Sequence, residues 1–162
     1  MTPLEAINGA YALLPGRMNS PAATVLLLAI QYQEDPQRLQ AQVGGPARGL
    51  WQFEKGGGVT GVLTHRASRS FALHVCAELG VTPTTASVMA ALERGDDRLD
   101  AALARLLLWT DSAPLPALGD VADAWACYLR VWRPGAAKRD AEGLRRKWSV
   151  NYARALDTYR AG

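Results

Sequence analysis

The chain has 162 residues, of which 49% are apolar and 20% charged, as in ordinary globular proteins. These proportions exclude a disordered tail, a collagen-like rod and a disulfide-stapled mini-protein. Alanine and leucine supply 50 residues, whereas valine, isoleucine and threonine supply 21. Because the former favour helices and the β-branched residues favour strands, the composition predicts a mainly α-helical protein. The length corresponds to a single domain, residues 1–162.

Positive charge is concentrated near the C-terminal end. Residues 1–127 carry 9 lysines and arginines against 12 acidic residues, whereas residues 128–162 carry 9 against 3. This asymmetry favours an anionic partner, such as nucleic acid, a membrane surface or a bacterial wall, although a solvated arginine-rich face fits equally well. We expect no nucleic-acid partner, because the arginines lack interleaved stacking aromatics at a regular spacing.

Apolar spacing and end signals predict about seven to eight helices in one compact domain, with clear segments at 3–14, 21–35, 67–79, 82–93, 97–109, 120–130 and 141–160. The second helix follows Ser20-Pro21 and is apolar on all sides, so we expect it at the centre of the domain. Between Gln42 and Gly61, seven glycines predict an irregular loop, with a small hairpin as an alternative, that lines a cleft.

Cys76 and Cys127 lie far apart and have apolar neighbours, so we expect core thiols of a protein made in a reducing cytoplasm, with a disulfide as the alternative. The spacing of the cysteines and histidines fits no zinc site, and we expect no metal and no cofactor. The N-terminal segment has no signal-peptide pattern, and the longest apolar stretch, 22–30, is about half as long as a membrane span. We therefore expect no membrane span.

Glu34 stands at the end of the apolar second helix. Partial desolvation there raises the pKa of a carboxyl group, and a carboxylic acid still protonated near neutrality can donate a proton to a glycosidic oxygen. The glycine-rich segment adds Trp51, Gln52 and Phe53, which could form an aromatic wall and amide hydrogen bonds for a sugar chain. A solvated glutamate is the alternative interpretation.

Two segments together resemble the paired motif of lytic transglycosylases and goose-type lysozymes. The first is Ala-Ile-Gln-Tyr-Gln-Glu-Asp at 29–35, and the second is Gly-Pro-Ala-Arg-Gly-Leu-Trp-Gln at 45–52, with 18 residues from Glu34 to Gln52. In that family an apolar helix ends in Gln-Glu-Ser, and a later Gly-Ala-Arg-Gly-Leu-Met-Gln segment completes the site. The amino-acid sequence of the second segment resembles phage-encoded members most. Tyr128, followed by Trp-Arg-Pro-Gly at 132–135, adds to this resemblance.

The resemblance implies a lysozyme-like fold and a muramidase that cleaves the β-1,4 linkage between N-acetylmuramic acid and N-acetylglucosamine in peptidoglycan. Glu34 would be the catalytic acid and base. Gln52, Trp51 and Arg48 would bind the glycan, and Tyr128 would reach the glutamate, although a core tyrosine is an equal alternative. The protein would be made in a host cytoplasm without a signal peptide and would act on the cell wall, either in the virion, beside other virion proteins, or at lysis.

Two residues depart from the family pattern. Trp51 replaces a methionine, which enlarges the surface for stacking on a sugar. Asp35 replaces a serine. Adjacent helical residues point about 100° apart, so we expect Asp35 to face away from the site. Asp35 is also the one feature that favours the alternative function, a non-enzymatic virion or ejection protein that retains the scaffold.

The products of cleavage depend on a second carboxylate. Hydrolysis requires one near the acid, whereas in lytic transglycosylases the hydroxyl of the muramic acid attacks and one glutamate suffices. Glu54 and Asp111 are the candidates for the second group. We favour the mechanism with one glutamate.

Overall fold

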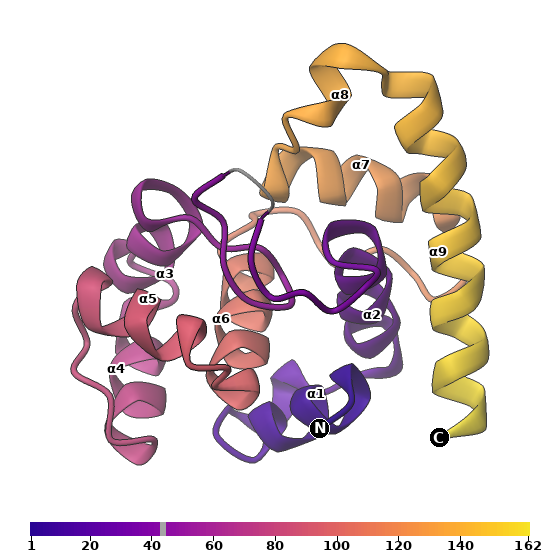
Figure 1. Cartoon of the computed structure of the whole chain (residues 1–162). Coiled ribbons are helices and arrows are strands. Elements are labelled where there is room, and N and C mark those ends of the chain that lie inside the picture. Colours follow the sequence, from indigo (N-terminus) through magenta and orange to yellow (C-terminus); the bar gives the residue numbers. More distant parts are fainter. Residues whose placement is uncertain (43–44) are drawn as a thin grey trace.

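A computed structural model describes residues 1–42 and 45–162 and shows a mainly helical protein, as predicted (Figure 1). Within these residues there are nine α-helices and no strand. The helices are α1 (Pro3–Tyr11), α2 (Pro21–Glu34), α3 (Thr60–Thr64), α4 (Arg69–Glu78), α5 (Thr85–Glu93), α6 (Asp97–Trp109), α7 (Val121–Trp132), α8 (Ala136–Arg139) and α9 (Ala141–Ala161). A 3₁₀ turn at Gly16–Met18 precedes α2, and a π turn at Lys55–Val59 leads into α3.

Side-chain caps set the start of the longer helices. The Ser20 hydroxyl accepts a hydrogen bond from the Ala23 amide at 3.1 Å and starts α2, and Asp96 accepts one from the Leu99 amide at 3.2 Å and starts α6. The expected helix from residue 82 begins instead at Thr85, because the Thr84 hydroxyl caps it. The sequence did not predict α3 and α8, which are too short to show a helical period.

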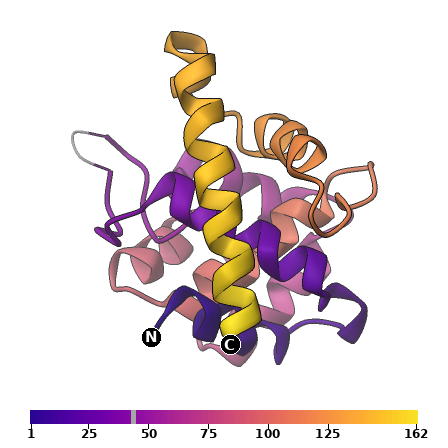
Figure 2. The same cartoon turned by 90° about the vertical axis from the view of Figure 1, so that its right-hand side faces the viewer.

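The central position predicted for α2 is confirmed. All ten residues from Ala23 to Tyr32 are buried, which explains why this helix is apolar on every side. Helices α1, α6 and α9 pack around it, and α9 crosses its outer face over most of the height of the molecule (Figure 2). The C-terminal turn of α2 emerges between α7 and α9, and Glu34 is its last residue.

The described residues of the glycine-rich segment form an anchored loop and contain no strand. Two isolated antiparallel bridges join Arg48 to Ala41 and to Phe53. The Trp51 indole N–H donates to the Leu27 carbonyl of α2 at 2.9 Å, and the Leu50 amide donates to the Asp100 carboxyl group of α6. The loop is therefore attached to both central helices, although local sequence gives it no regular structure.

Cys76 and Cys127 are free, buried thiols, so the predicted core thiols are confirmed and the alternative disulfide is absent. Burial raises the pKa of both thiols, that of Cys127 to about 11. Neither thiol is therefore a reactive thiolate near neutral pH.

None of the described helices combines the length and apolar character that crossing a bilayer requires.

Candidate active site

The carboxyl group of Glu34 and the hydroxyl of Tyr128 meet although they are 94 residues apart in the chain. The Tyr128 hydroxyl, on α7, donates a hydrogen bond to Glu34 Oε1 at 2.7 Å. Tyr128 is 1% exposed, and its ring stacks on Trp148 of α9 with the ring centroids 4.8 Å apart. This packing holds the phenol in one orientation, so the Glu34 carboxyl is held at a defined place at the end of α2.

The environment of Glu34 raises its pKa from 4.5 to about 7. Burial is the largest cause, because the ionised carboxylate loses hydration at the end of the apolar helix. The negative charge of Glu54 raises the pKa further, while the hydrogen bond from Tyr128 stabilises the carboxylate and lowers it. Glu34 can therefore release and recover a proton near neutral pH.

A cavity of about 340 Å³ opens at this carboxyl group. It lies between the end of α2, the glycine-rich loop and the segment that joins α7 to α9. Glu34, Gln52, Glu54 and Tyr128 all line it, so the structure brings together three of the five predicted site residues and one of the two candidate second carboxylates. The remaining lining residues include Gln33, Gln42, Ala47, Trp132, Arg133, Pro134, Arg139 and Leu144.

Gln52 reaches the cavity from a tight turn at 49–52. Its backbone has φ +56°, a left-handed conformation, and its side-chain Nε2 donates to the Gly49 carbonyl at 2.8 Å. Gly49 itself has φ +83°, and a Cβ there would collide with the Asp100 carboxyl group of α6. Since the Leu50 amide also donates to Asp100, this buried side chain positions the turn that carries Gln52.

The prediction that Trp51 offers a surface to a sugar is wrong. Its side chain is fully buried, with its indole N–H bonded to the Leu27 carbonyl of α2. Arg48 also lies outside the cavity lining. Its guanidinium donates to two carbonyls of its own loop at 2.8 and 2.9 Å and pairs with Glu93 at 3.4 Å. These two residues shape the loop rather than the surface of the cavity.

Besides Tyr128, the cavity is lined by the aromatic side chain of Trp132, at the end of α7. Its indole N–H donates to the Trp51 carbonyl at 3.0 Å, which joins α7 to the glycine-rich loop. Arg133 follows with φ +51°, another left-handed residue at the cavity wall. A second hollow of about 580 Å³ shares Trp132 and Arg133 with this cavity and is also lined by the glycines at 56–58.

The sequence Trp-Arg-Pro-Gly at 132–135 belongs to the resemblance described above, but no role for Trp132 or Arg133 followed from it. A tryptophan and an arginine directly before a Pro-Gly pair were the available signal, since such turns commonly end a helix at the surface. Local pattern could not show that this turn faces Glu34, because the path of the chain between α6 and α7 decides the position of α7.

Asp35 faces away from the site, as predicted. Asp35 is 5% exposed, and its carboxylate accepts hydrogen bonds from the backbone amides of Leu39 and Gln40, each at 2.8 Å. The Asp35 side chain thus holds the turn that follows α2. Asp111 is also outside the cavity and pairs with Arg130 through two hydrogen bonds at 3.0 and 2.6 Å, which lower its pKa.

In the described part of the chain, no group of three or more histidine, cysteine, aspartate or glutamate side chains is arranged to hold a metal ion. Family models, curated proteins and solved structures yielded no match to the chain.

Proposed function

We propose that this protein is a peptidoglycan-cleaving muramidase in which Glu34 is the catalytic acid and base. The observation that carries the proposal is a carboxyl group with a pKa of about 7, bonded by Tyr128 at 2.7 Å and open to a groove. A groove with an aromatic wall, an amide and arginines suits an anionic glycan strand, because sugars stack on aromatic faces and hydrogen-bond to amides. The motifs at 29–35 and 45–52 agree with the lysozyme-like family.

In the favoured mechanism, protonated Glu34 donates its proton to the glycosidic oxygen as the bond from that oxygen to the anomeric carbon breaks. Tyr128 then stabilises the carboxylate through its hydrogen bond. The carboxylate takes the proton of the muramic acid hydroxyl as the oxygen of that hydroxyl bonds to the anomeric carbon. The products are a shortened glycan and a chain with an anhydro-muramyl end, and Glu34 is protonated again.

Hydrolysis with a second carboxylate is the alternative outcome of the same reaction. Glu54 lines the same cavity and is exposed to solvent, so it is the candidate for holding a water molecule. Asp111 does not fit this role, since it lies outside the cavity and is paired with Arg130.

The test is a digest of purified peptidoglycan by the wild type and by Glu34→Gln, with the soluble fragments identified by mass spectrometry. We expect anhydro-muramyl ends from the wild type and at least about a thousandfold slower release by the variant, because the amide cannot donate a proton. Reducing ends that disappear in Glu54→Gln would indicate hydrolysis instead. Equal digestion by wild type and Glu34→Gln would refute the assignment of the site.

The rival proposal, a virion protein without enzymatic activity, had one supporting feature in the sequence, Asp35 in place of serine. In the structure, Asp35 accepts hydrogen bonds from the amides of Leu39 and Gln40. An aspartate at this position therefore has a structural role, and it is not evidence against catalysis by Glu34. The absence of fragments from walls of several bacteria would nevertheless favour this rival. For the enzyme we propose a phage or prophage origin, with synthesis in the host cytoplasm and action at the wall.

A further inference from the structure

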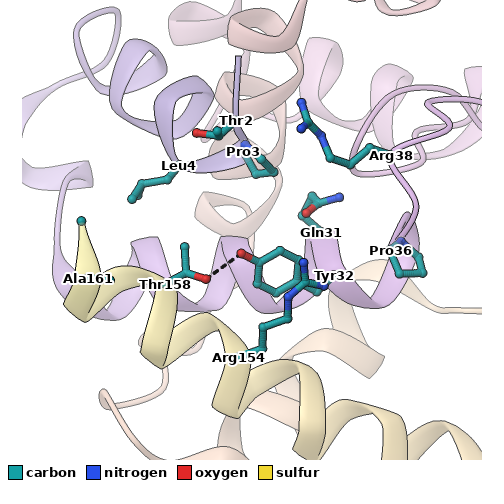
Figure 3. A pocket seen from close by; sticks show the side chains of 11 residues that line it. Thr2, Pro3, Leu4, Gln31, Tyr32, Pro36, Arg38, Arg154, Thr158 and Ala161 are labelled. Carbon is teal, nitrogen blue, oxygen red and sulfur yellow. Dashed lines mark hydrogen bonds between the residues drawn. The ribbon is translucent and has the colours of Figure 1, made fainter.

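A second pocket, of about 520 Å³, lies on another side of the molecule, between the first turn of α1, the end of α2 and the last turns of α9. Figure 3 shows its side chains: Leu4 and Pro36 supply apolar surface, and Tyr32, Arg38 and Arg154 supply an aromatic ring and two guanidinium groups. We call it the α1–α9 pocket. None of its lining residues belongs to the cavity at Glu34.

Gln31 at this pocket has a polar atom without a partner. Its side chain is 1% exposed, and Nε2 donates to the Asp35 carbonyl at 2.8 Å. That bond identifies the nitrogen, so the other atom of the amide is the acceptor Oε1, which has no hydrogen-bond partner in the described structure. A buried acceptor left unpaired costs about 1–3 kcal/mol. Because Oε1 is itself buried, a ligand that donates a hydrogen bond to it binds only after the side chain of Gln31, or an atom that covers it, shifts to expose the oxygen.

The two arginines at the rim lack a carboxylate partner. Among the described residues, the ion pairs are Arg48 with Glu93 and Arg130 with Asp111. The guanidinium of Arg154 lies over the Tyr32 ring, 3.8 Å from its centroid, while the Tyr32 hydroxyl bonds Thr158 at 2.8 Å. Stacking on the ring fixes the plane of the Arg154 guanidinium and leaves its N–H edge for a planar anion.

Arg38 is held at the same rim by a strained turn. Its backbone has φ +55°, its amide donates to the Asp35 carbonyl at 3.0 Å, and its guanidinium donates to the Met1 carbonyl. The Asp35 carbonyl therefore bonds both the backbone of Arg38 and the side chain of Gln31. A non-glycine residue in this conformation costs free energy that the surrounding contacts must offset.

We propose that the α1–α9 pocket binds the carboxylate end of a short peptide. The carboxylate would pair with Arg154 and Arg38, the neighbouring amide N–H would donate to Gln31 Oε1, and small apolar side chains would contact Leu4 and Pro36. An amide N–H beside a carboxylate is the combination that a peptide terminus offers, whereas a phosphate ester brings acceptors alone. The volume fits a ligand of two or three residues. This proposal does not depend on the proposed function.

The experiment is a titration of isotope-labelled full-length protein with N-acetyl-Ala-Ala, in its L,L and D,D forms, followed by two-dimensional NMR. We expect saturable shifts of the Gln31 side-chain amide and of the Arg154 guanidinium resonance. The methylamide, which lacks the carboxylate, should bind at least about tenfold more weakly, and an ester analogue without the amide N–H at least about threefold more weakly. Tighter binding of the L,L form would indicate an ordinary peptide terminus, and tighter binding of the D,D form would indicate a D-alanyl wall peptide.

Variants separate this pocket from the site at Glu34. Arg154→Gln should weaken binding about tenfold, and the matched control Arg160→Gln, exposed on the same helix but outside the pocket, should leave it unchanged. Glu34→Gln should bind the peptide like the wild type. The proposal is overturned if the methylamide binds equally, if inorganic phosphate displaces the peptide at equal concentration, if the shifts map to the Glu34 cavity, or if millimolar peptide gives no saturable shift.

Discussion

At the scale of single residues, Glu34 shows opposing influences on one carboxyl group. Burial and the charge of Glu54 raise its pKa, and the Tyr128 hydroxyl lowers it, with about 7 as the result. A carboxyl group whose pKa is higher in the folded than in the unfolded state destabilises the fold once it ionises. The feature that suits Glu34 to proton transfer therefore costs stability at neutral pH.

This cost predicts how Glu34→Gln changes stability with pH. Between pH 4.5 and about 7 the folded wild type holds the proton that the unfolded chain has lost, so its free energy of unfolding falls as pH rises. Glutamine cannot ionise and avoids this loss. We expect Glu34→Gln to gain up to about 3 kcal/mol over the wild type between pH 4 and pH 8, measured by urea unfolding at several pH values.

Other groups with a raised pKa, such as Asp100, also make stability depend on pH, but they are present in both proteins. The difference in the free energy of unfolding between wild type and Glu34→Gln at each pH therefore removes their contribution. A difference that stays constant from pH 4 to pH 8 would contradict the raised pKa of Glu34.

At the scale of elements, contacts with the neighbouring helices hold the part of the glycine-rich segment that lines the cavity at Glu34. Three contacts hold the turn at 49–52: the Leu50 amide bonds Asp100, the Gly49 amide bonds the Gln40 carbonyl at 2.8 Å, and the Trp51 indole bonds the Leu27 carbonyl. Burial raises the pKa of the Asp100 carboxyl group well above its ordinary value. The turn at 49–52 is thereby attached to both central helices.

Gly49→Ala tests this anchoring. The left-handed backbone at φ +83° costs a non-glycine residue about 1–2 kcal/mol, and the new Cβ also collides with Asp100. We expect a loss of about 3 kcal/mol or more in the free energy of unfolding, and slower wall digestion because Gln52 moves with the turn.

The matched control is Gly80→Ala, where φ is +67° and no atom lies within 4 Å of the new Cβ. It should lose only the backbone part, about 1–2 kcal/mol, and digest peptidoglycan normally. Equal losses for the two variants would show that Asp100 does not anchor the turn.

At the scale of the whole molecule, α9 contributes to both pockets. It packs along α2, and Trp148 on α9 stacks on Tyr128 beside Glu34, while Arg154 near the other end of α9 covers the α1–α9 pocket. The basic residues of this segment, 128–162, outnumber its acidic residues by 9 to 3. Arg133 and Arg139 of this segment stand at the cavity of Glu34, so its positive charge extends to the proposed glycan site.

This charge predicts salt-dependent action on an anionic wall. Raising the ionic strength from about 50 to about 300 mM shortens the range of attraction from about 14 to about 6 Å, so we expect the KM for intact peptidoglycan to rise several-fold while kcat changes little. The measurement is the initial rate of wall digestion at each salt concentration, with thermal unfolding as the control for stability. A KM independent of salt would contradict a role for the basic segment in wall binding.

The sequence by itself determined the helical character, the long helices, the start of α2 after Ser20, and the position of Glu34 at the end of a buried helix, because these depend on residues within a few positions of one another. The tertiary structure decided which side chains meet Glu34. Tyr128 reaches it across 94 residues, and Trp132 takes the place at the cavity that the sequence had suggested for Trp51. In an irregular loop, no local periodicity sets the direction of a side chain. Packing of the loop against α2 and α6 therefore buries Trp51, and Trp132 of α7 lines the cavity instead.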